Sequence, residues 1–222
     1  MRQKGYSEAE LVNANLARRS DKNGRTSCYD NFRNRMMIPI IDLRGNVIAF
    51  GGRVLDDAKP KYVNTSDTLV YKKSQAIFAL NFAKSANQGK LILAEGYMDV
   101  IAYHQAGFTN AVACWGTALT REQARLLARY ADEVILSYDA DGAGQEATRR
   151  AIGIFNEIGM KLRVLRLSGG KDPDEILRQY GPDRLRDLLE GAANDVEYRL
   201  LREREKFDVP SRTARSAFSP PP

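Results

Sequence analysis

The spacing of apolar residues divides the chain near residue 90. Ahead of that point, apolar runs at 36–42 and 47–54 flank Arg44-Gly45-Asn46, a pattern that predicts a β-hairpin. Gly51-Gly52 inside the second run indicates a bulge or the close approach of another backbone or a ligand. The other expected segments of this half are a helix opened by a capping box at 7–10 and reaching Leu16 and Ala17, a polar loop at 19–35, an irregular basic stretch at 55–73 and a helix at 74–86.

After residue 90, short apolar runs alternate with helical stretches. The expected strands lie at 91–94, 110–114, 133–138 and 161–167, and the expected helices lie at 97–106, from 120 onward, at 143–158, from 172 onward and at 182–206. This alternation predicts βαβ units with right-handed crossovers. The fold class is therefore α/β, with a mostly parallel sheet flanked by helices, preceded by a smaller basic α+β subdomain and followed by charged helices. The expected divisions are 1–88, 89–170, 171–208 and a disordered tail at 209–222.

The net charge of +6 is unevenly distributed along the chain. Residues 1–90 carry 16 Lys and Arg against 8 Asp and Glu, whereas residues 91–222 carry 18 against 20. A basic front half and a slightly acidic back half suggest a surface for a polyanion beside a carboxylate-rich site. The alternative is that the basic residues only solvate a surface, and charge alone leaves both interpretations open.

Length and composition exclude several classes of protein. The 222 residues are 43% hydrophobic and 28% charged, which is typical of a globular chain. No apolar run reaches the roughly 18 residues needed to span a bilayer, and the first residues lead into no apolar signal segment. Cys28 and Cys114 give neither a disulfide framework nor a four-ligand zinc site. We therefore expect a cytoplasmic protein without membrane contact, with two reduced thiols and no zinc.

Acidic residues follow three of the predicted strands at the point where each strand ends. They are Glu95 after 91–94, Asp139 and Asp141 after 133–138, and Asp172 and Asp174 after 161–167. In open parallel sheets, ligands bind beyond the carboxyl ends of the strands. Converging carboxylates repel one another unless a cation lies among them, and oxygen ligands without His or Cys select Mg²⁺ or Mn²⁺. The sequence therefore predicts a divalent-metal site suited to phosphoryl or nucleotidyl transfer.

Each acidic motif also has a simpler explanation. Asp172 has the position of a helix N-cap, and Asp-x-Asp-Gly is common in turns. An EF-hand at 139–150 is excluded, because its twelfth position is Arg150 rather than Glu. A phosphatase with an Asp-x-Asp nucleophile is harder to exclude, but that pair would follow the first strand of the sheet rather than the third.

Several motifs together resemble one protein family. Glu-Gly-Tyr-Met-Asp-Val at 95–100, Tyr-Asp-Ala-Asp-Gly-Ala-Gly at 138–144 and Lys-Asp-Pro-Asp at 171–174 resemble the Toprim motifs of bacterial, DnaG-type primases. The runs at 29–40, 44–53 and 60–64 resemble that family's first hairpin and the segments on either side of it. Topoisomerases and small nucleases share the Rossmann-like Toprim fold but lack the hairpin with Phe-Gly-Gly-Arg. The resemblance covers about residues 5–208 and is specific to primases.

The resemblance implies a catalytic core that makes short RNA primers on a single-stranded DNA template from ribonucleoside triphosphates, with an RNA–DNA product. The family's metal-binding acids match Glu95, Asp139, Asp141, Asp172 and Asp174, of which Glu95, Asp139 and Asp141 would be catalytic. Asp99 lies one helical turn after Glu95 and supports the site. Nucleotide and template binding carries over to Arg53, Lys61, Asn64 and Lys72 or Lys73, and guanidinium suits phosphate because it binds two oxygens. Tyr29, Phe32, Tyr62 and Tyr71 either stack template bases or pack the subdomain, and His104 and Trp115 are expected to be structural.

The chain departs from the family pattern toward both ends. It has no Cys/His cluster for the zinc-binding domain, the front of the core looks shortened, and nothing after residue 206 matches the helicase-docking domain. The expectation is a monomeric piece of the catalytic core, with the replicative helicase a partner of the full-length protein only. Two other functions stay open. The chain could be an inactive fragment that binds single-stranded DNA, or a metal-dependent Toprim nuclease, which would shorten labelled strands rather than lengthen them.

Overall fold

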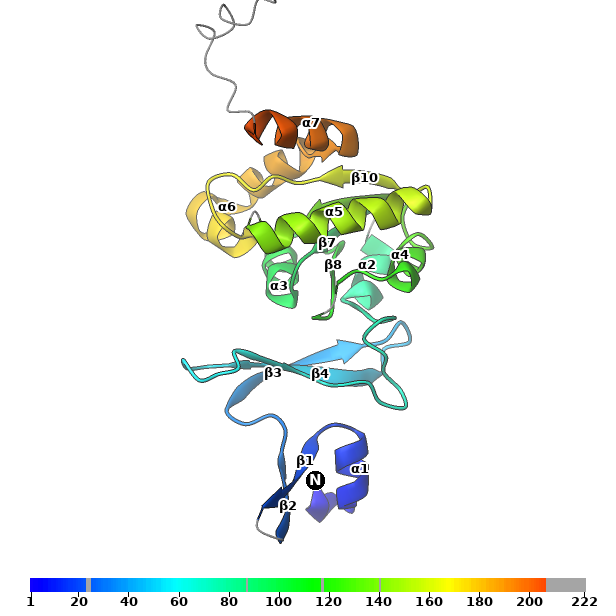
Figure 1. Cartoon of the computed structure of the whole chain (residues 1–222), viewed down its shortest axis with the longest axis vertical. Helices are drawn as coiled ribbons and strands as arrows, with labels where there is room; N and C mark the ends of the chain where they lie inside the picture. Colours follow the sequence, from blue (N-terminus) through cyan, green and yellow to red (C-terminus); the bar gives the residue numbers. More distant parts are fainter. Residues whose placement is uncertain (23–24, 87, 117, 140, 207–222) are drawn as a thin grey trace, which may run out of the picture.

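The computed structural model describes residues 1–22, 25–86, 88–116, 118–139 and 141–206. These residues form an elongated molecule of three tiers (Figure 1). A helix and a hairpin near the N-terminus occupy one end, a small antiparallel sheet lies in the middle, and an α/β unit occupies the other end. No helix among the described residues is both long and apolar enough to cross a membrane.

The first tier combines a confirmed prediction with a wrong one. Helix α1 (Glu8–Asn13), after a 3₁₀ turn η1 (Arg2–Lys4), begins at the predicted capping box: the Ser7 hydroxyl accepts from the Glu10 N–H, and the Ser7 N–H donates to the Glu10 carboxylate. The helix ends before Leu16 and Ala17, which lie beyond it. The polar loop expected at 19–35 is wrong, because strands β1 (Ala17–Lys22) and β2 (Arg25–Asp30) pair there as an antiparallel hairpin.

The middle tier is the predicted hairpin with a third strand added. Strands β3 (Arg35–Ile41) and β4 (Val47–Val54) pair antiparallel, and β5 (Tyr62–Asn64) joins β4 from within the stretch expected to be irregular. Ile38, Ile40 and Ala49 are buried and face the α/β unit. Met36, Met37 and Val47 on the same two strands are exposed, so these strands are only partly covered.

The third tier has the predicted mostly parallel sheet. Its strand order is β11-β10-β9-β7-β8-β6, in which β7 (Lys90–Ala94), β8 (Ala111–Cys114), β9 (Glu133–Ser137) and β10 (Lys161–Val164) run parallel. Short antiparallel strands β6 (Ile77–Phe78) and β11 (Ala193–Asn194) form its edges. The helices are α2 (Leu80–Ala86), α3 (Tyr97–Gln105), α4 (Arg121–Leu127), α5 (Gly142–Glu157), α6 (Pro173–Glu190) and α7 (Asp195–Lys206).

Alternate residues of β7 build two separate cores. Leu91 and Leu93 pack on one face of the sheet with α2, α4 and α5, whereas Ile92 and Ala94 pack on the other face with α3 and α6. Both faces are covered, which explains why the strands read as continuous apolar runs rather than as alternating ones.

Two predicted helices are corrected. Within the helix expected at 74–86, Ile77 and Phe78 instead pair with β8, and α2 begins only after Ala79, which has a φ of 63°. The helical region expected at 182–206 is interrupted by β11, which separates the end of α6 from α7, whereas the kink of α6 at Gly181 agrees with a second helical segment that begins at 182. The tail expected to be disordered at 209–222 lies outside the described residues.

Candidate metal centre and nucleic-acid interface

The carboxyl ends of β7 and β9 lie side by side and carry the first acids of the site. Ala94 pairs with Ser137 at the last rung of the two strands. Glu95 follows Ala94 directly, Asp139 comes two residues after Ser137, and the Asp139 N–H donates a 3.0 Å hydrogen bond to Glu95 Oε2. The sheet therefore brings together two acids that are 44 residues apart in the sequence.

The charges around Asp139 and Asp99 show which carboxylates share this edge of the sheet. Burial, and after it the negative charges of Glu95, Asp141 and Asp172, together raise the pKa of Asp139 to about 6. Burial likewise raises the pKa of Asp99 to about 6, with smaller contributions from Asp139, Asp172 and Glu95 and an opposing one from its hydrogen bond with the Gly96 N–H. Five of the six predicted acids thus repel one another at one place.

Two of these acids also begin helices. Asp141 Oδ1 accepts a 2.7 Å hydrogen bond from the Gly144 N–H and caps α5, and Asp172 Oδ1 accepts one of 2.8 Å from the Glu175 N–H and caps α6. Asp172 is therefore a helix N-cap, as its position in the sequence indicated. Each cap uses one carboxylate oxygen, so the other oxygen stays available to a ligand. Gly144 lies tightly against the strand end, because a Cβ there would be 2.1 Å from the Asp139 carbonyl oxygen.

Asp174 is not brought into this group. It lies on the first turn of α6, and its carboxylate contacts the Arg178 guanidinium one turn later at 2.8 Å. Its charge is not among those that raise the pKa of Asp99 or Asp139.

The donor set fits a hard divalent cation. All the grouped ligands are carboxylate oxygens, and two of them hold protons more tightly than an isolated carboxyl because of burial and mutual repulsion. Among the described residues, no three Asp, Glu, His or Cys side chains are already arranged as a ligand set around one point. Binding of an ion would therefore require the side chains to turn inward from their present positions.

Basic residues of the middle sheet approach the acids through an aromatic contact. The Arg53 guanidinium lies 5.9 Å from the centre of the Tyr62 ring, and Lys61 Nζ lies 5.5 Å from it. Tyr62 meets Tyr97 edge to face, with ring centres 5.5 Å apart. Tyr97 is only two residues after Glu95, so the basic strand and the acidic loop are neighbours.

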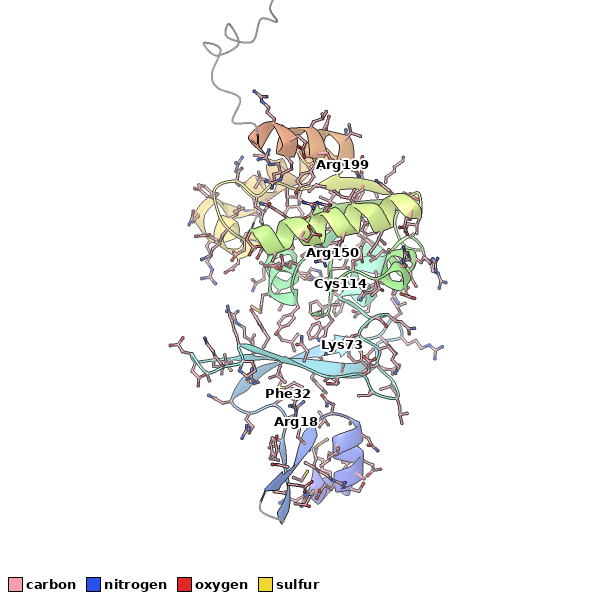
Figure 2. All side chains as sticks on the ribbon, viewed as in Figure 1. Arg18, Phe32, Lys73, Cys114, Arg150 and Arg199 are labelled. Carbon is pink, nitrogen blue, oxygen red and sulfur yellow. The ribbon has the colours of Figure 1, made fainter. Side chains whose placement is uncertain are left out.

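The other predicted binding residues lie along the same boundary. Asn64 sits between Gly51 and Gly116, and its buried Oδ1 has no hydrogen-bond partner among the described residues. Lys73 lies where the middle sheet meets the α/β unit (Figure 2). The exposed Lys72 Nζ is 3.8 Å from Asp67. Of the four aromatic residues considered for base stacking, Tyr71 is buried and packs in the core and Phe32 is partly buried, whereas Tyr29 and Tyr62 are exposed.

Two residues have the structural roles expected of them. His104 Nε2 lies 3.0 Å from the Ala111 carbonyl oxygen, which fixes the ring against β8. Trp115 is fully buried and stacks on Tyr97, with ring centres 4.6 Å apart and planes at 18°. The stack itself was not predicted, because nothing in the sequence indicates that positions 97 and 115 meet.

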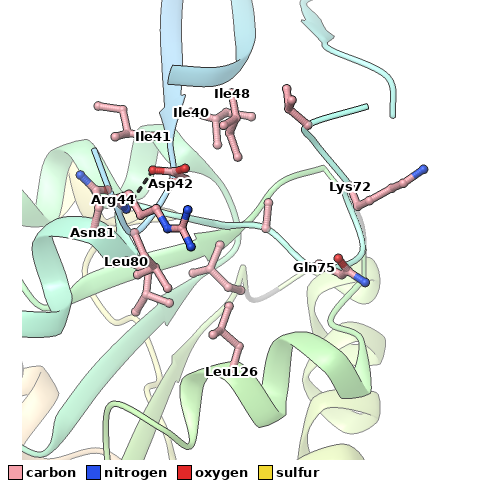
Figure 3. Close-up of a pocket in the computed structure, with 14 residues that line it drawn as sticks. Ile40, Ile41, Asp42, Arg44, Ile48, Lys72, Gln75, Leu80, Asn81 and Leu126 are labelled. Carbon is pink, nitrogen blue, oxygen red and sulfur yellow. Dashed lines mark hydrogen bonds between the residues drawn. The ribbon is translucent and has the colours of Figure 1, made fainter. Parts of the chain in front are cut away.

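A cavity of about 320 Å³ lies between the β3–β4 hairpin and the α/β unit (Figure 3). Its walls are mainly aliphatic, with Ile40, Ile48, Leu80 and Leu126 among them, and the Lys72 side chain points away from it. None of the grouped acids lines this cavity, so it is separate from the candidate metal centre.

Comparison with known proteins decides which family has this arrangement. Residues 1–84 match the model of the DNA primase catalytic core, N-terminal domain, and residues 92–177 match a Toprim-like model. The RNA polymerase domain of Mycobacterium tuberculosis primase DnaG superposes with a TM-score of 0.81 at 33% identity, covering 96% of this chain and 71% of that one. The chain belongs to the DnaG-type DNA primase family.

Other members of the family are similar over most of this chain. The DNA primase of Clostridium acetobutylicum is 47% identical over 210 residues, and that of Deinococcus radiodurans is 46% identical over 213. The alignments cover 94% of this chain but only 35% and 37% of those proteins, so the chain spans about a third of the length of these curated relatives. A DnaG primase catalytic domain solved with single-stranded DNA has a TM-score of 0.79 at 37% identity over 87% of this chain and 62% of that one.

Proposed function

We propose that this chain is the catalytic core of a DNA-dependent RNA primase, which joins ribonucleoside triphosphates into short RNA primers on single-stranded DNA. The observation that carries the proposal is the approach of Arg53 and Tyr62 to Tyr97, beside the acids. Nucleotidyl transfer needs a cation site near groups that bind phosphates, and the Tyr62–Tyr97 contact supports this arrangement because it links Arg53 to the segment that follows Glu95. A role in copying chromosomal DNA would place the protein in the cytoplasm.

The acids are proposed to hold Mg²⁺ or Mn²⁺ through Glu95, Asp139, Asp141 and Asp172, with Asp99 behind them. Such ions activate the attacking 3′-hydroxyl and neutralise the leaving pyrophosphate. Asp174 would join the site only by releasing Arg178. No zinc site is part of the proposal.

The basic side is proposed to bind the polyanions. Arg53 and Lys61 would contact nucleotide and template phosphates, with Asn64 and Lys72 or Lys73 beside them.

Glu95 Oε2 accepts the Asp139 N–H and so orients the loop that carries Asp139 and Asp141. The chain thereby contributes binding, orientation and electrostatic stabilisation. A replicative helicase would be a partner of the longer protein.

The test is primer synthesis on a short single-stranded template with labelled ribonucleotides and Mn²⁺. The wild type is expected to extend, and Asp139→Asn or Asp141→Asn is expected to lose at least about 100-fold in rate while keeping its circular dichroism spectrum. Asp183→Asn is a matched control, since Asp183 is exposed on α6 and pairs with Arg186. A wild type that binds DNA but makes no RNA would contradict the proposal, and shortened strands would instead indicate a nuclease.

A further inference from the structure

The middle sheet packs against the α/β unit through an apolar cluster that includes the indole ring of Trp115. The cluster combines Ile38, Ile40 and Ala49 of the sheet with Tyr71, Tyr97 and Trp115. Trp115 directly follows β8 and is fully buried. It is also the only tryptophan in the sequence.

The Trp115 indole packs against the backbone of Gly51 in β4. A Cβ on Gly51 would lie 2.3 Å from Trp115 Cζ2 and 2.7 Å from Cη2, distances that side chains do not tolerate. The indole therefore rests directly on bare backbone, and any side chain at position 51 would push the sheet and the indole apart.

Short contacts connect the Gly51–Trp115 pair to both the acidic and the basic groups of the proposed site. On one side, Trp115 stacks on Tyr97, which opens α3 two residues after Glu95. On the other side, Gly51 lies two residues before Arg53 on β4, whose guanidinium lies over Tyr62, and Tyr62 meets Tyr97 edge to face. Movement at the Gly51–Trp115 contact would therefore change the separation between the cationic and the acidic groups.

The residues around this contact include three buried polar atoms. Trp115 Nε1, Tyr97 Oη and Asn64 Oδ1 are buried without a hydrogen-bond partner among the described residues.

We propose that Gly51 and Trp115 are positioning residues that set the spacing between Arg53 and the Glu95–Asp139 pair. The inference rests on the proposed function, because the spacing matters only if one substrate spans both groups. Neither residue touches the reacting atoms in this scheme. Each half-site keeps its own binding, and the stacked indole determines whether both act on the same phosphate.

The first test is Gly51→Ala in the full chain. We expect kcat for RNA synthesis to fall by about 10- to 100-fold, because small misplacements of reacting groups have effects of this size. Affinity for single-stranded DNA and the rise in melting temperature with Mg²⁺ are expected to stay within about twofold of the wild type, since each depends on one half-site. Gly153→Ala is the matched control, because a Cβ at that exposed position of α5 meets no atom within 4 Å.

The second test is rescue by a smaller ring. Phenylalanine lacks the outer indole atoms that a Cβ at position 51 would meet, so Gly51→Ala/Trp115→Phe is expected to regain about tenfold in kcat over Gly51→Ala. Trp115 emission provides a further readout that needs no activity, since it is expected to shift to longer wavelength in Gly51→Ala and not in Gly153→Ala.

The outcomes separate the two proposals. Wild-type kcat in Gly51→Ala, unchanged emission, or a double variant no faster than the single one would overturn the positioning role. Parallel loss of DNA affinity, Mg²⁺ response and kcat would also overturn it, since that would be general destabilisation. A wild-type chain that makes no primers would instead overturn the proposed function itself.

Discussion

Glu95 orients Asp139 through the main chain: the Asp139 N–H donates a 3.0 Å hydrogen bond to Glu95 Oε2. The contact joins the ends of two neighbouring parallel strands, so the position of one acid depends on the other. It also holds two negative side chains close together, and the resulting repulsion makes the site responsive to pH and to cations.

Removal of the Asp139 charge is expected to stabilise the metal-free protein. Burial, Glu95 and other acids raise the pKa of Asp139 to about 6, from an ordinary 3.8. The folded chain therefore holds this proton more tightly than the unfolded chain, so stability falls as the pH rises from about 4 to about 6, and the full cost is present above that range. In a chelator at pH 7.5, Asp139→Asn is expected to melt about 1–3 °C higher than the wild type, a modest gain because water screens this partly exposed group.

The sign of the pH dependence checks the cause of that gain. As the pH falls from 7.5 toward 4, the wild-type carboxyl takes up its proton and the difference between the two melting temperatures should shrink. A difference that grows at low pH would rule out relief of repulsion as the explanation. Asp183→Asn provides the baseline for the loss of one exposed carboxylate.

Divalent cations are expected to stabilise the fold through the same acids. Mg²⁺ at about 100 times its dissociation constant should add about 2.7 kcal/mol to the free energy of unfolding, since the ion binds only the folded chain. Glu95→Gln should lose most of that increment, and Asp183→Asn should keep it. Thermal melts with and without a chelator measure both. An equal Mg²⁺ response in all three proteins would place the ion elsewhere.

Binding of single-stranded DNA is expected to depend on salt through the middle sheet. For a single strand, removing the cation that binds one phosphate should reduce the magnitude of the slope of log K against log salt by about 0.7. Fluorescence anisotropy of Lys61→Ala and Arg53→Ala measures that change. Arg121→Ala is a suitable control, because its exposed guanidinium forms an ion pair with Glu157 on the α/β unit. Identical slopes for all variants would argue against a template groove at Arg53 and Lys61.

The two thiols are expected to differ strongly in reactivity. Cys114 is buried in the sheet, and burial raises the pKa of its thiol to about 12, whereas Cys28 is partly exposed on β2. The thiolate is the reactive form, so iodoacetamide should label Cys28 and leave Cys114 untouched in the native protein. Mass spectrometry of the labelled peptides measures the ratio, and both should react in denaturant. Fast labelling of native Cys114 would contradict this packing.

The acids could be predicted from the sequence because their strands are buried on both faces. The apolar runs at Leu91–Leu93 and Val134–Leu136 indicate buried strands, and the acids that come within three residues of each run lie at the same edge of the parallel sheet. Asp174 shows the limit of that argument. It follows a strand in sequence, but the helix that begins at Asp172 turns its side chain toward Arg178.

The elements that were not predicted have no regular alternation of apolar and polar residues in the sequence. Strands β1 and β2 are largely exposed on both faces, so their residues show no alternation and resemble a loop. Ile77, Phe78 and Leu80 have helical spacing, yet Ile77 and Phe78 pair with strand β8. Local propensity does not indicate this pairing. The Tyr97–Trp115 stack is likewise a tertiary contact between distant positions, and only the glycine pair at 51–52 hinted that something would come close.

Gly144 limits which substitutions the first turn of α5 can accept during evolution. A Cβ at that position would lie 2.1 Å from the Asp139 carbonyl oxygen, whereas one at Gly142, two residues earlier, would meet no atom within 4 Å. Every missense change in the Gly144 codon adds at least that one carbon, so even alanine should be purged there. The neighbouring Gly142 codon has no such steric barrier and can drift. Sequence variation across the first turn of α5 should therefore be uneven, with an invariant position two residues after a permissive one.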